Sequence, residues 1–213
     1  MAWLLVVVAA VVATGDWVAV HTRRKRLEYV CKPAVMVALV GAALTIDATD
    51  GATRSWFVVA LALSLLGDVF LMVTERPWTF PSGLASFVLA HLAYIVGFFV
   101  EGVTIAGLAI GTAVIAVAVA TLGRLVHRAV RASPESELVA PVTVYIGVIS
   151  AMVASATGTL DPLAIAGAAL FYASDALIAW NRFVHHQRHG RLAIIVTYHL
   201  AQALLVLSLA SAT

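Results

Sequence analysis

Long apolar stretches recur along the whole of this sequence, and most of them approach the roughly 20 residues that an α-helix needs to cross a bilayer. Hydrophobic residues make up 62% of the 213 residues and charged residues only 11%. Soluble domains carry about 25% charged residues. Because so few charges would leave a soluble core of this size uncovered, the sequence predicts an integral membrane protein and excludes a soluble globular one.

The apolar windows predict an all-α, polytopic membrane protein with eight transmembrane helices in a single bundle. Helices suit these windows because a helix satisfies its own backbone hydrogen bonds inside the bilayer. The expected spans cover about residues 2–21, 33–46, 55–74, 81–100, 103–122, 138–157, 162–182 and 191–211. These spans use most of the chain, so we expect one transmembrane domain, residues 1–213, without an extramembrane domain.

The positive charges predict how this bundle is oriented. All of the 13 Lys and Arg residues except Arg54 fall in the connections on one side of an eight-helix bundle. The positive-inside rule makes that side cytoplasmic and places both termini on the non-cytoplasmic side. The basic residues Arg23 to Arg26 follow the first window instead of preceding it, which favours a retained helix over a signal peptide. Orientation explains the net charge of +2, so we expect no nucleic-acid partner.

Acidic residues within the predicted spans are candidate functional residues, because a charge at bilayer depth costs a few kcal/mol. These acids are Asp16, Asp68 and Asp175. Asp68 and Asp175 lie roughly 10 Å inside the expected cytoplasmic boundary, at the helical rise of about 1.5 Å per residue. Tyr145 and Tyr198 share that level. The pattern predicts a polar cavity that opens to the cytoplasmic leaflet and has the acids at its base.

Other polar side chains are expected around this cavity. The residues that we expect to support or orient the acids are His91, Tyr94, Tyr145, Ser174, Tyr198 and Gln202. The residues expected at the mouth of the cavity are Lys32, Asn181 and Arg182. For Tyr94, Tyr145, Ser174 and Gln202, hydrogen bonding between helices is an equally good interpretation.

Asp16 and His199 are not assigned to the catalytic set. Asp16 lies near the basic cluster that follows the first span, so we expect it to pair with Arg23 or Lys32 and to have a structural role. His199 lies one position from the helix face of Tyr198, which is typical of a satisfied core histidine.

Two buried carboxyl groups that share a site can hold one proton between them. Such a pair supplies an acid that donates a proton and a carboxylate that stabilises a cation or directs a water molecule, as in glycosidases. Asp68 and Asp175 are the candidates for this aspartate dyad. Cys31 is the only cysteine, which excludes a zinc or iron–sulfur site built from several cysteines. We expect neither a metal nor a cofactor.

Short segments in a fixed order carry a family resemblance. They are Lys32-Pro33, Ser64-Leu65-Leu66-Gly67-Asp68, Gly83-Leu84 with Phe87, Ala90-His91-Leu92-Ala93-Tyr94, Tyr145 with Met152, Phe171-Tyr172-Ala173-Ser174-Asp175, and Thr197-Tyr198 with Ala201-Gln202. Together they resemble the YhhN-type lysoplasmalogenase family over about residues 30–210. The first helix, which contains Asp16, is not part of the resemblance.

The resemblance implies an eight-helix membrane hydrolase that cleaves the vinyl-ether bond of lysoplasmalogens. The products are a fatty aldehyde and glycerophosphoethanolamine or glycerophosphocholine, and the two acids of the family fall on Asp68 and Asp175. A lysophospholipid substrate suits the expected cavity, because Lys32 and Arg182, with Asn181 beside them, are placed to meet its phosphate. Spans rich in Ala and Val, with eleven Arg to two Lys, favour a bacterial cytoplasmic membrane.

Other functions remain open from the residues alone. A small-solute or proton-coupled transporter would use the buried acids as ion or proton sites, but it predicts polar residues at several depths. An intramembrane aspartyl protease is disfavoured by Leu65, where its motif requires Gly, and by Ser174 before Asp175. A haem-binding electron carrier would have His91 and His199 as its one pair of axial ligands.

Overall fold

The computed structural model describes residues 1–48, 50–73, 76 and 78–211. All regular structure in these ranges is helical, and eight of the helices are long and apolar enough to cross a membrane. The predicted all-α membrane fold is therefore confirmed.

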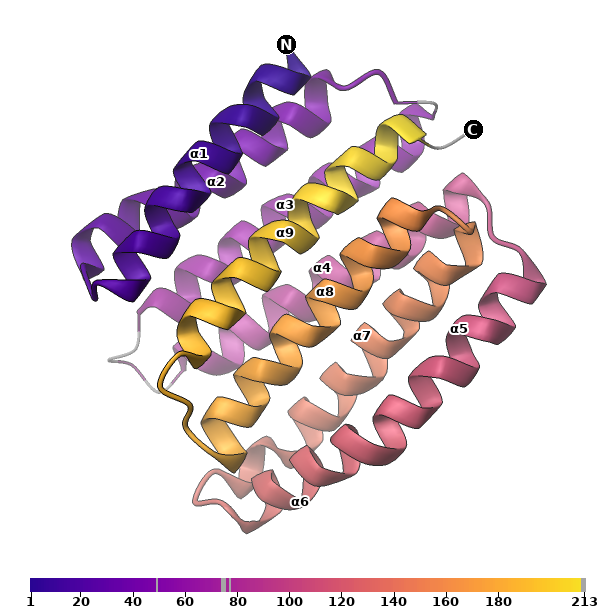
Figure 1. Ribbon diagram of the computed structural model, residues 1–213. Helices are drawn as coiled ribbons and strands as arrows, with labels where there is room; N and C mark the ends of the chain where they lie inside the picture. The colour runs from indigo at the N-terminus through magenta and orange to yellow at the C-terminus, as the bar shows by residue number, and fades with distance from the viewer. Residues whose placement is uncertain (49, 74–75, 77, 212–213) are drawn as a thin grey trace.

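The helices run back and forth, and the start of α1 lies at the same end of the bundle as the end of α9 (Figure 1). Their bounds are α1 (Ala2–His21), α2 (Lys25–Thr45), α3 (Gly51–Met72), α4 (Thr79–Glu101), α5 (Ile105–Ala118), η1 (Val119–Gly123), α6 (Arg124–Ala132), η2 (Ser136–Leu138), α7 (Val139–Thr159), α8 (Pro162–Ala179), η3 (Trp180–Val184) and α9 (Gly190–Ser211). The segments η1 and η3 are π-helical. They continue α5 into α6 and extend α8, so each belongs to one long span.

Two of these helices are longer than the apolar windows predict. The helix expected at 33–46 begins at Lys25, because Pro33 lies inside α2 and does not start it. The helix expected at 103–122 continues to Ala132. Its last turns are amphipathic, with Val126 and Val130 packed in a small cluster with Leu138, so hydropathy alone misses them. The expected end of the third span at Thr74 lies outside the described residues.

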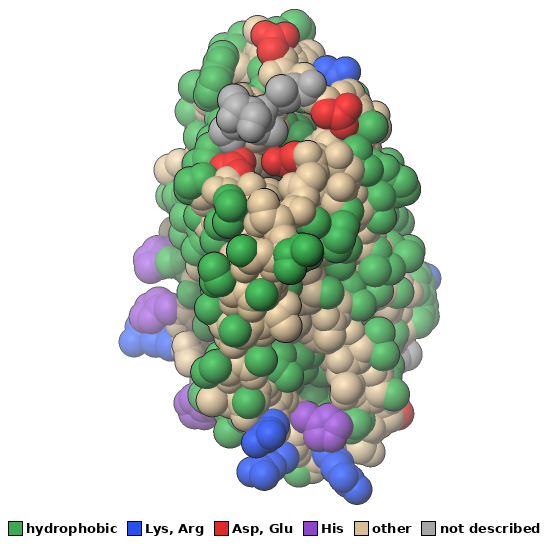
Figure 2. Space-filling model, turned by 90° about the vertical axis from the view of Figure 1, so that its right-hand side faces the viewer, with side chains coloured by type: hydrophobic (Ala, Val, Ile, Leu, Met, Phe, Trp, Pro, Cys, Tyr) green, Lys and Arg blue, Asp and Glu red, His purple; other side chains and the backbone are tan. Residues whose placement is uncertain are grey.

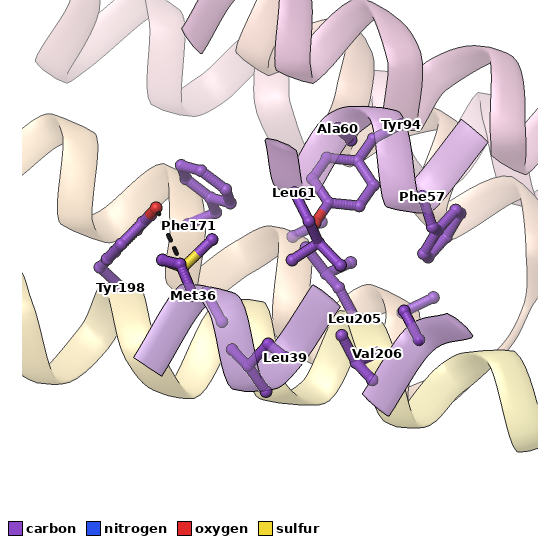
Figure 3. Close-up of a cluster of buried hydrophobic side chains, with 14 of the residues drawn as sticks. Met36, Leu39, Phe57, Ala60, Leu61, Tyr94, Phe171, Tyr198, Leu205 and Val206 are labelled. Carbon is purple, nitrogen blue, oxygen red and sulfur yellow. Dashed lines mark hydrogen bonds between the residues drawn. The ribbon is translucent and has the colours of Figure 1, made fainter. Parts of the chain in front are cut away.

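Small residues bring the helices close enough to form a continuous core. A Cβ added at Gly111 of α5 would lie only 2.8 Å from the Cα of Ala154 on α7, which is the close backbone approach typical of membrane helix pairs. Larger side chains fill the space among α2, α3, α4 and α9, where Met36, Leu61 and Tyr94 are fully buried (Figure 3). This core fixes the rotation of the helices that carry the candidate site.

The entry of α3 is fixed outside the membrane by a helix cap. The Asp50 carboxylate accepts hydrogen bonds from the backbone N–H of Thr53 at 2.7 Å and from its hydroxyl at 2.9 Å. These hydrogen bonds favour the charged form and hold the pKa of Asp50 below its usual value. The capped start sets the register in which α3 enters the bundle.

Charged side chains gather at the two ends of the molecule. On the face drawn in Figure 2, most of the acidic side chains lie toward one end, whereas most of the Lys and Arg side chains lie toward the other. Most of the surface between the two ends is apolar or uncharged. This distribution suits a protein whose helices cross a membrane between the two charged ends.

Candidate active site

Asp68 is buried on α3 and is held by two partners from other helices. The Lys32 ammonium Nζ on α2 lies 2.8 Å from its Oδ1, and the Tyr198 hydroxyl on α9 donates to its Oδ2 at 2.7 Å. One cation and one hydroxyl donor both favour the carboxylate form. Lys32 and Tyr198 therefore stabilise a negative charge on Asp68 that burial alone would disfavour.

Two further predicted residues hold Tyr198 in place. The Gln202 side-chain amide donates to the Tyr198 hydroxyl at 3.4 Å, and the Tyr94 hydroxyl donates to Gln202 Oε1 at 2.6 Å. The Tyr198 hydroxyl also lies 3.5 Å from the Met36 sulfur (Figure 3). This chain of contacts joins α2, α4 and α9 behind Asp68, so Tyr94 and Gln202 position Tyr198.

Asp175 on α8 has a different set of partners. The Tyr145 hydroxyl donates to Asp175 Oδ2 at 2.5 Å. His91 Nε2 lies 3.3 Å from the same oxygen, without the alignment of a full hydrogen bond. The other ring nitrogen, Nδ1, is in contact with the backbone carbonyl of Phe87, so Nδ1 carries a proton.

That contact turns Nε2 of His91 toward Asp175 Oδ2. A proton added to this pair would therefore lie between Nε2 and Oδ2. The His91–Asp175 pair has the arrangement of a group that can take up and donate a proton, whereas Lys32 and Tyr198 stabilise the carboxylate form of Asp68.

Two aromatic rings separate these groups. The Phe171 ring centroid lies 4.7 Å from that of His91 and 5.4 Å from that of Tyr198. Phe87 also contacts both rings, at 6.5 and 6.0 Å. No hydrogen bond joins the two described carboxyl groups. Each acid therefore has its own environment.

An apolar cavity reaches Asp175 from one side. Its lining comes mainly from α4, η1, α6, α7, α8 and η3, and the polar lining residues are Tyr145, Tyr172 and Asp175. The Asp175 carboxyl group thus forms part of the wall of an apolar cavity of about 70 Å³.

A polar cavity of about 560 Å³ adjoins the apolar one, since Leu71, Phe80 and Ile178 line both. Its charged and polar lining residues are Lys25, Glu28, Tyr29, Lys32, Asn181, Arg182, His186 and Arg191. The two cavities together fit an amphiphile with an anionic head. In the part of the chain that the structure describes, no three His, Cys, Asp or Glu side chains are placed to hold a metal ion.

Arg182 and Asn181 line the polar cavity, as predicted, but both are already engaged. Arg182 donates two hydrogen bonds to Glu135, at 2.8 and 2.9 Å, and lies 3.7 Å from the centroid of the Phe80 ring. Asn181 Oδ1 accepts from the backbone N–H of Gln187 at 2.8 Å. A ligand phosphate would therefore compete with Glu135 for Arg182.

Ser174 and Asp16 lie away from this site. The Ser174 hydroxyl donates to the Ile194 carbonyl at 3.0 Å, which joins α8 to α9. Asp16 does not form the expected pair with Arg23 or Lys32, because Lys32 is bound to Asp68. Asp16 is instead fully buried on α1, with His199 Nε2 4.0 Å from its Oδ2.

His199 belongs to this packing contact between α1 and α9. Its Nδ1 accepts from the Trp17 ring N–H at 3.2 Å, and the two rings are stacked. His199 is buried in the core as expected, but its Nε2 has no hydrogen-bond partner among the described residues, so it is not a fully satisfied histidine.

Several residues around the acids are not among the site residues that the sequence predicts. Phe87 and Phe171 form the wall between the two acids, and Glu28 holds Arg191 through hydrogen bonds of 2.7 and 2.9 Å. The predicted second span begins at residue 33, so Glu28 falls in the connection before it. In the structure α2 begins two turns earlier, and Glu28 lies one turn before Lys32 on the same helix face.

In a comparison with known proteins, a family model described as the YhhN family matches residues 27–209 of the chain. A Mycobacterium tuberculosis protein named lysoplasmalogenase is 35% identical over 173 residues, which are 79% of this chain and 66% of that protein. A Rattus norvegicus protein named lysoplasmalogenase TMEM86B is 31% identical over 180 residues, which are 84% of this chain and 70% of that protein.

The matched region spans slightly less than two thirds of the length of the mycobacterial relative. The Homo sapiens protein of the same name as the rat relative is 33% identical over 149 residues, 70% of this chain and 61% of that protein. No solved structure was found to match the chain. The whole of α1, including Asp16, lies outside the family match.

Proposed function

The chain belongs to the YhhN family, and we propose that it hydrolyses the vinyl-ether bond of lysoplasmalogens. The names of its relatives support this substrate class. The reaction adds one water molecule to R–CH=CH–O–R′ and yields the aldehyde R–CH₂–CHO and the alcohol HO–R′, a glycerophospho-headgroup.

The observation that carries this proposal is the position of Asp175 in the wall of an apolar cavity that adjoins a cationic one. In a lysoplasmalogen, the vinyl ether lies where the hydrocarbon chain meets the glycerol. A chain in the apolar cavity and a phosphate near Lys32 or Arg182 would bring that bond close to the junction of the two cavities.

The first chemical step is protonation of the vinyl-ether carbon next to the alkyl chain. We assign this proton to the His91–Asp175 pair, since Asp175 lines the apolar cavity and its Oδ2 lies 3.3 Å from His91 Nε2. The carbon–carbon π electrons form the new C–H bond, and the positive charge then lies on the oxocarbenium group. Tyr145 holds the donor oxygen in place through its hydrogen bond to Asp175.

The second step is capture of the oxocarbenium ion by water. A carboxylate stabilises the cation and accepts the proton that the attacking water loses. We assign this role to Asp68, whose carboxylate form Lys32 and Tyr198 stabilise. Asp68 itself lines neither cavity, and Lys32, which lines the polar one, joins it to the substrate site. The resulting hemiacetal collapses: its carbon–oxygen bond to glycerol breaks, the leaving oxygen takes the proton held by Asp68, and the hemiacetal hydroxyl proton passes to Asp175. The aldehyde and the headgroup alcohol leave, and both acids return to their starting states.

The headgroup is proposed to lie in the polar cavity, with its phosphate bound by Lys32, Asn181 and Arg182. Arg182 would exchange Glu135 for the phosphate when substrate binds. We further propose a bacterial cytoplasmic membrane as the location and the cytoplasmic leaflet as the side from which substrate enters.

The test is aldehyde release by the full chain, purified in detergent, from 1-alkenyl-glycerophosphoethanolamine and from its 1-alkyl analogue. The saturated ether has no double bond to protonate, so aldehyde is expected from the alkenyl lipid only. Aldehyde release from neither lipid, or equally from both, would contradict the proposal.

Substitution of Gly123 tests whether the apolar cavity holds the hydrocarbon chain. Gly123 lines that cavity, so Gly123→Leu should shorten the space for the chain. We expect KM for a long-chain substrate to rise about tenfold while KM for a short-chain substrate changes little, since loss of a few buried methylenes, at about 0.8 kcal/mol each, gives this effect. Steady-state kinetics with the two substrates measure it.

Gly147→Leu is the matched control for this prediction. Gly147 is an exposed residue of α7, and a Cβ added there meets no atom within 4 Å. An equal rise in KM for both chain lengths in Gly123→Leu, or the same rise in Gly147→Leu, would show that the apolar cavity does not hold the chain.

Substitution of His91 tests its part in proton donation. His91→Gln keeps the size and polarity of the side chain but removes the ring nitrogen that lies 3.3 Å from Asp175 Oδ2. We expect kcat to fall by about 10- to 100-fold, below the range for loss of a full general acid, with little change in KM. His199→Gln is the matched control, because His199 is also a buried histidine but packs against Trp17. Equal losses of kcat in both variants would assign His91 a packing role only.

A further inference from the structure

A second polar cavity, of about 580 Å³, lies where the α1–α2 turn meets the connection from η3 to α9. Its basic lining residues are His21, Arg23, His186, Arg188, His189 and Arg191. It adjoins the proposed substrate cavity at His186 and Arg191, whereas Arg23 and Arg188 line only the second cavity. We call it the turn cavity.

Two of the three arginines that line the turn cavity have no acidic partner. Arg191 is paired with Glu28, whereas Arg23 and Arg188 form no ion pair within the described ranges. No Asp or Glu is among the described lining residues. Two unpaired arginines from two separate connections attract an anion.

The end of α1 places Arg23 at the turn cavity. Arg23 has φ = +58°, and the backbone N–H groups of Arg23 and Arg24 donate to the carbonyls of Val20 and Ala19 at 3.2 and 2.8 Å. This is a helix end at which glycine is the usual left-handed residue. Here the position carries a guanidinium instead.

The position of the turn cavity limits the nature of the anion. His21 ends the first membrane span and Gly190 begins the last, so the cavity lies at the depth of lipid headgroups. The planar guanidinium groups of Arg23 and Arg188 suit phosphate oxygens, which they bind through paired hydrogen bonds. Basic pockets at this depth commonly bind phosphorylated headgroups.

We propose that the turn cavity is a phosphate-binding site separate from the substrate cavity. Its ligand carries a phosphate group, either on the headgroup of an anionic membrane lipid or on a soluble phosphate compound. Binding there involves no bond cleavage, so this site does not depend on the proposed hydrolysis.

The experiment measures binding of two probes to the full chain. In the first arm, the protein in neutral detergent is titrated with inorganic pyrophosphate. In the second arm, native mass spectrometry counts phosphatidylglycerol bound to protein taken from phosphatidylcholine nanodiscs that contain a minor fraction of it. Selective binding in either arm supports the site and identifies the source of the phosphate. Lack of selective binding in both arms overturns it.

The decisive variant is Arg23→Gly, which removes the guanidinium and places glycine at this left-handed helix end. We expect affinity for the bound probe to fall about tenfold, the effect of losing one charge-assisted contact of about 1.4 kcal/mol. We expect the variant to melt no lower than the parent. Arg188→Gln should weaken binding to a similar extent.

Two controls separate this site from general effects. Leu160 has the same left-handed conformation, at φ = +61° in the α7–α8 connection at the other end of the bundle, so Leu160→Gly should make the same backbone change without any loss of binding. Arg128→Gln removes a positive charge from α6, which does not line the turn cavity. Parental affinity in Arg23→Gly, or an equal loss in Arg128→Gln, would overturn the proposal.

Discussion

Replacement of Asp175 with Asn is expected to lower kcat for aldehyde release by about 10²- to 10⁴-fold, the range found when a general acid is lost. Asn keeps the size of the side chain, but it has no proton to donate at the wall of the apolar cavity. Tyr145 can still hydrogen-bond to the amide oxygen, so we expect the variant to fold. Steady-state kinetics on a 1-alkenyl lysolipid measure the loss, and KM should change much less than kcat.

Asp68→Asn should lower kcat over the same range for a different reason, because it removes the carboxylate that stabilises the cation. Asp16→Asn is the matched control, since Asp16 is equally buried in a span but lies outside the site. We expect it to keep kcat within a few-fold of the parent. Near-parental kcat in either Asp68→Asn or Asp175→Asn would remove that acid from the mechanism.

The second large effect is expected on stability, from the pair of Lys32 and Asp68. Both side chains are mostly buried, with exposed fractions of 14% and 2%. Lys32→Met leaves the Asp68 carboxylate buried without its cation, and loss of one partner of a buried ion pair costs about 3–5 kcal/mol. We expect a clearly lower melting temperature in detergent for Lys32→Met than for the parent.

The double variant Lys32→Met/Asp68→Asn separates this cause from loss of packing. With no carboxylate left unpaired, it should recover much of the lost melting temperature while it remains inactive. Lys25→Met is the matched control, because Lys25 lies on the same helix and forms no ion pair among the described residues. A double variant that melts as low as Lys32→Met would show that the buried charge is not the cause.

The sequence allowed prediction of the membrane fold because apolar windows of about 20 residues have one structural solution in a bilayer. Helix ends were less predictable where the chain is amphipathic or contains proline. Arg124–Ala132 continues a span although it carries three arginines, because Val126 and Val130 on one face are buried. Pro33 lies inside α2 although proline more often begins a helix.

The candidate acids were predictable for a related reason, since a buried carboxylate is costly wherever it lies in a span. The hydrogen-bond partners of these acids could not be predicted from the sequence. Depth along a helix places Tyr198 and Tyr145 at the level of the acids, but the rotation and neighbours of each helix decide which acid each tyrosine reaches. Close packing such as that of Gly111 on Ala154 sets these rotations, and it depends on contacts between distant parts of the chain.

Lys32 shows most clearly the difference between the role predicted from the sequence and the contacts found in the structure. From the sequence it was a cation at a helix start, expected to bind the phosphate of the substrate. In the structure it lines the polar cavity and is also bound to Asp68. One side chain therefore connects the proposed headgroup site to the proposed catalytic carboxylate.

A reaction in D₂O measures directly whether the protein protonates the vinyl-ether carbon. The purified full chain is incubated with a 1-alkenyl lysolipid in D₂O, the aldehyde is reduced at once to prevent exchange, and the alcohol is analysed by mass spectrometry. We expect one deuterium at the carbon next to the former aldehyde carbon, with none in protein-free controls. Product without that deuterium, or no product at all, would show that the protein does not protonate the vinyl-ether carbon.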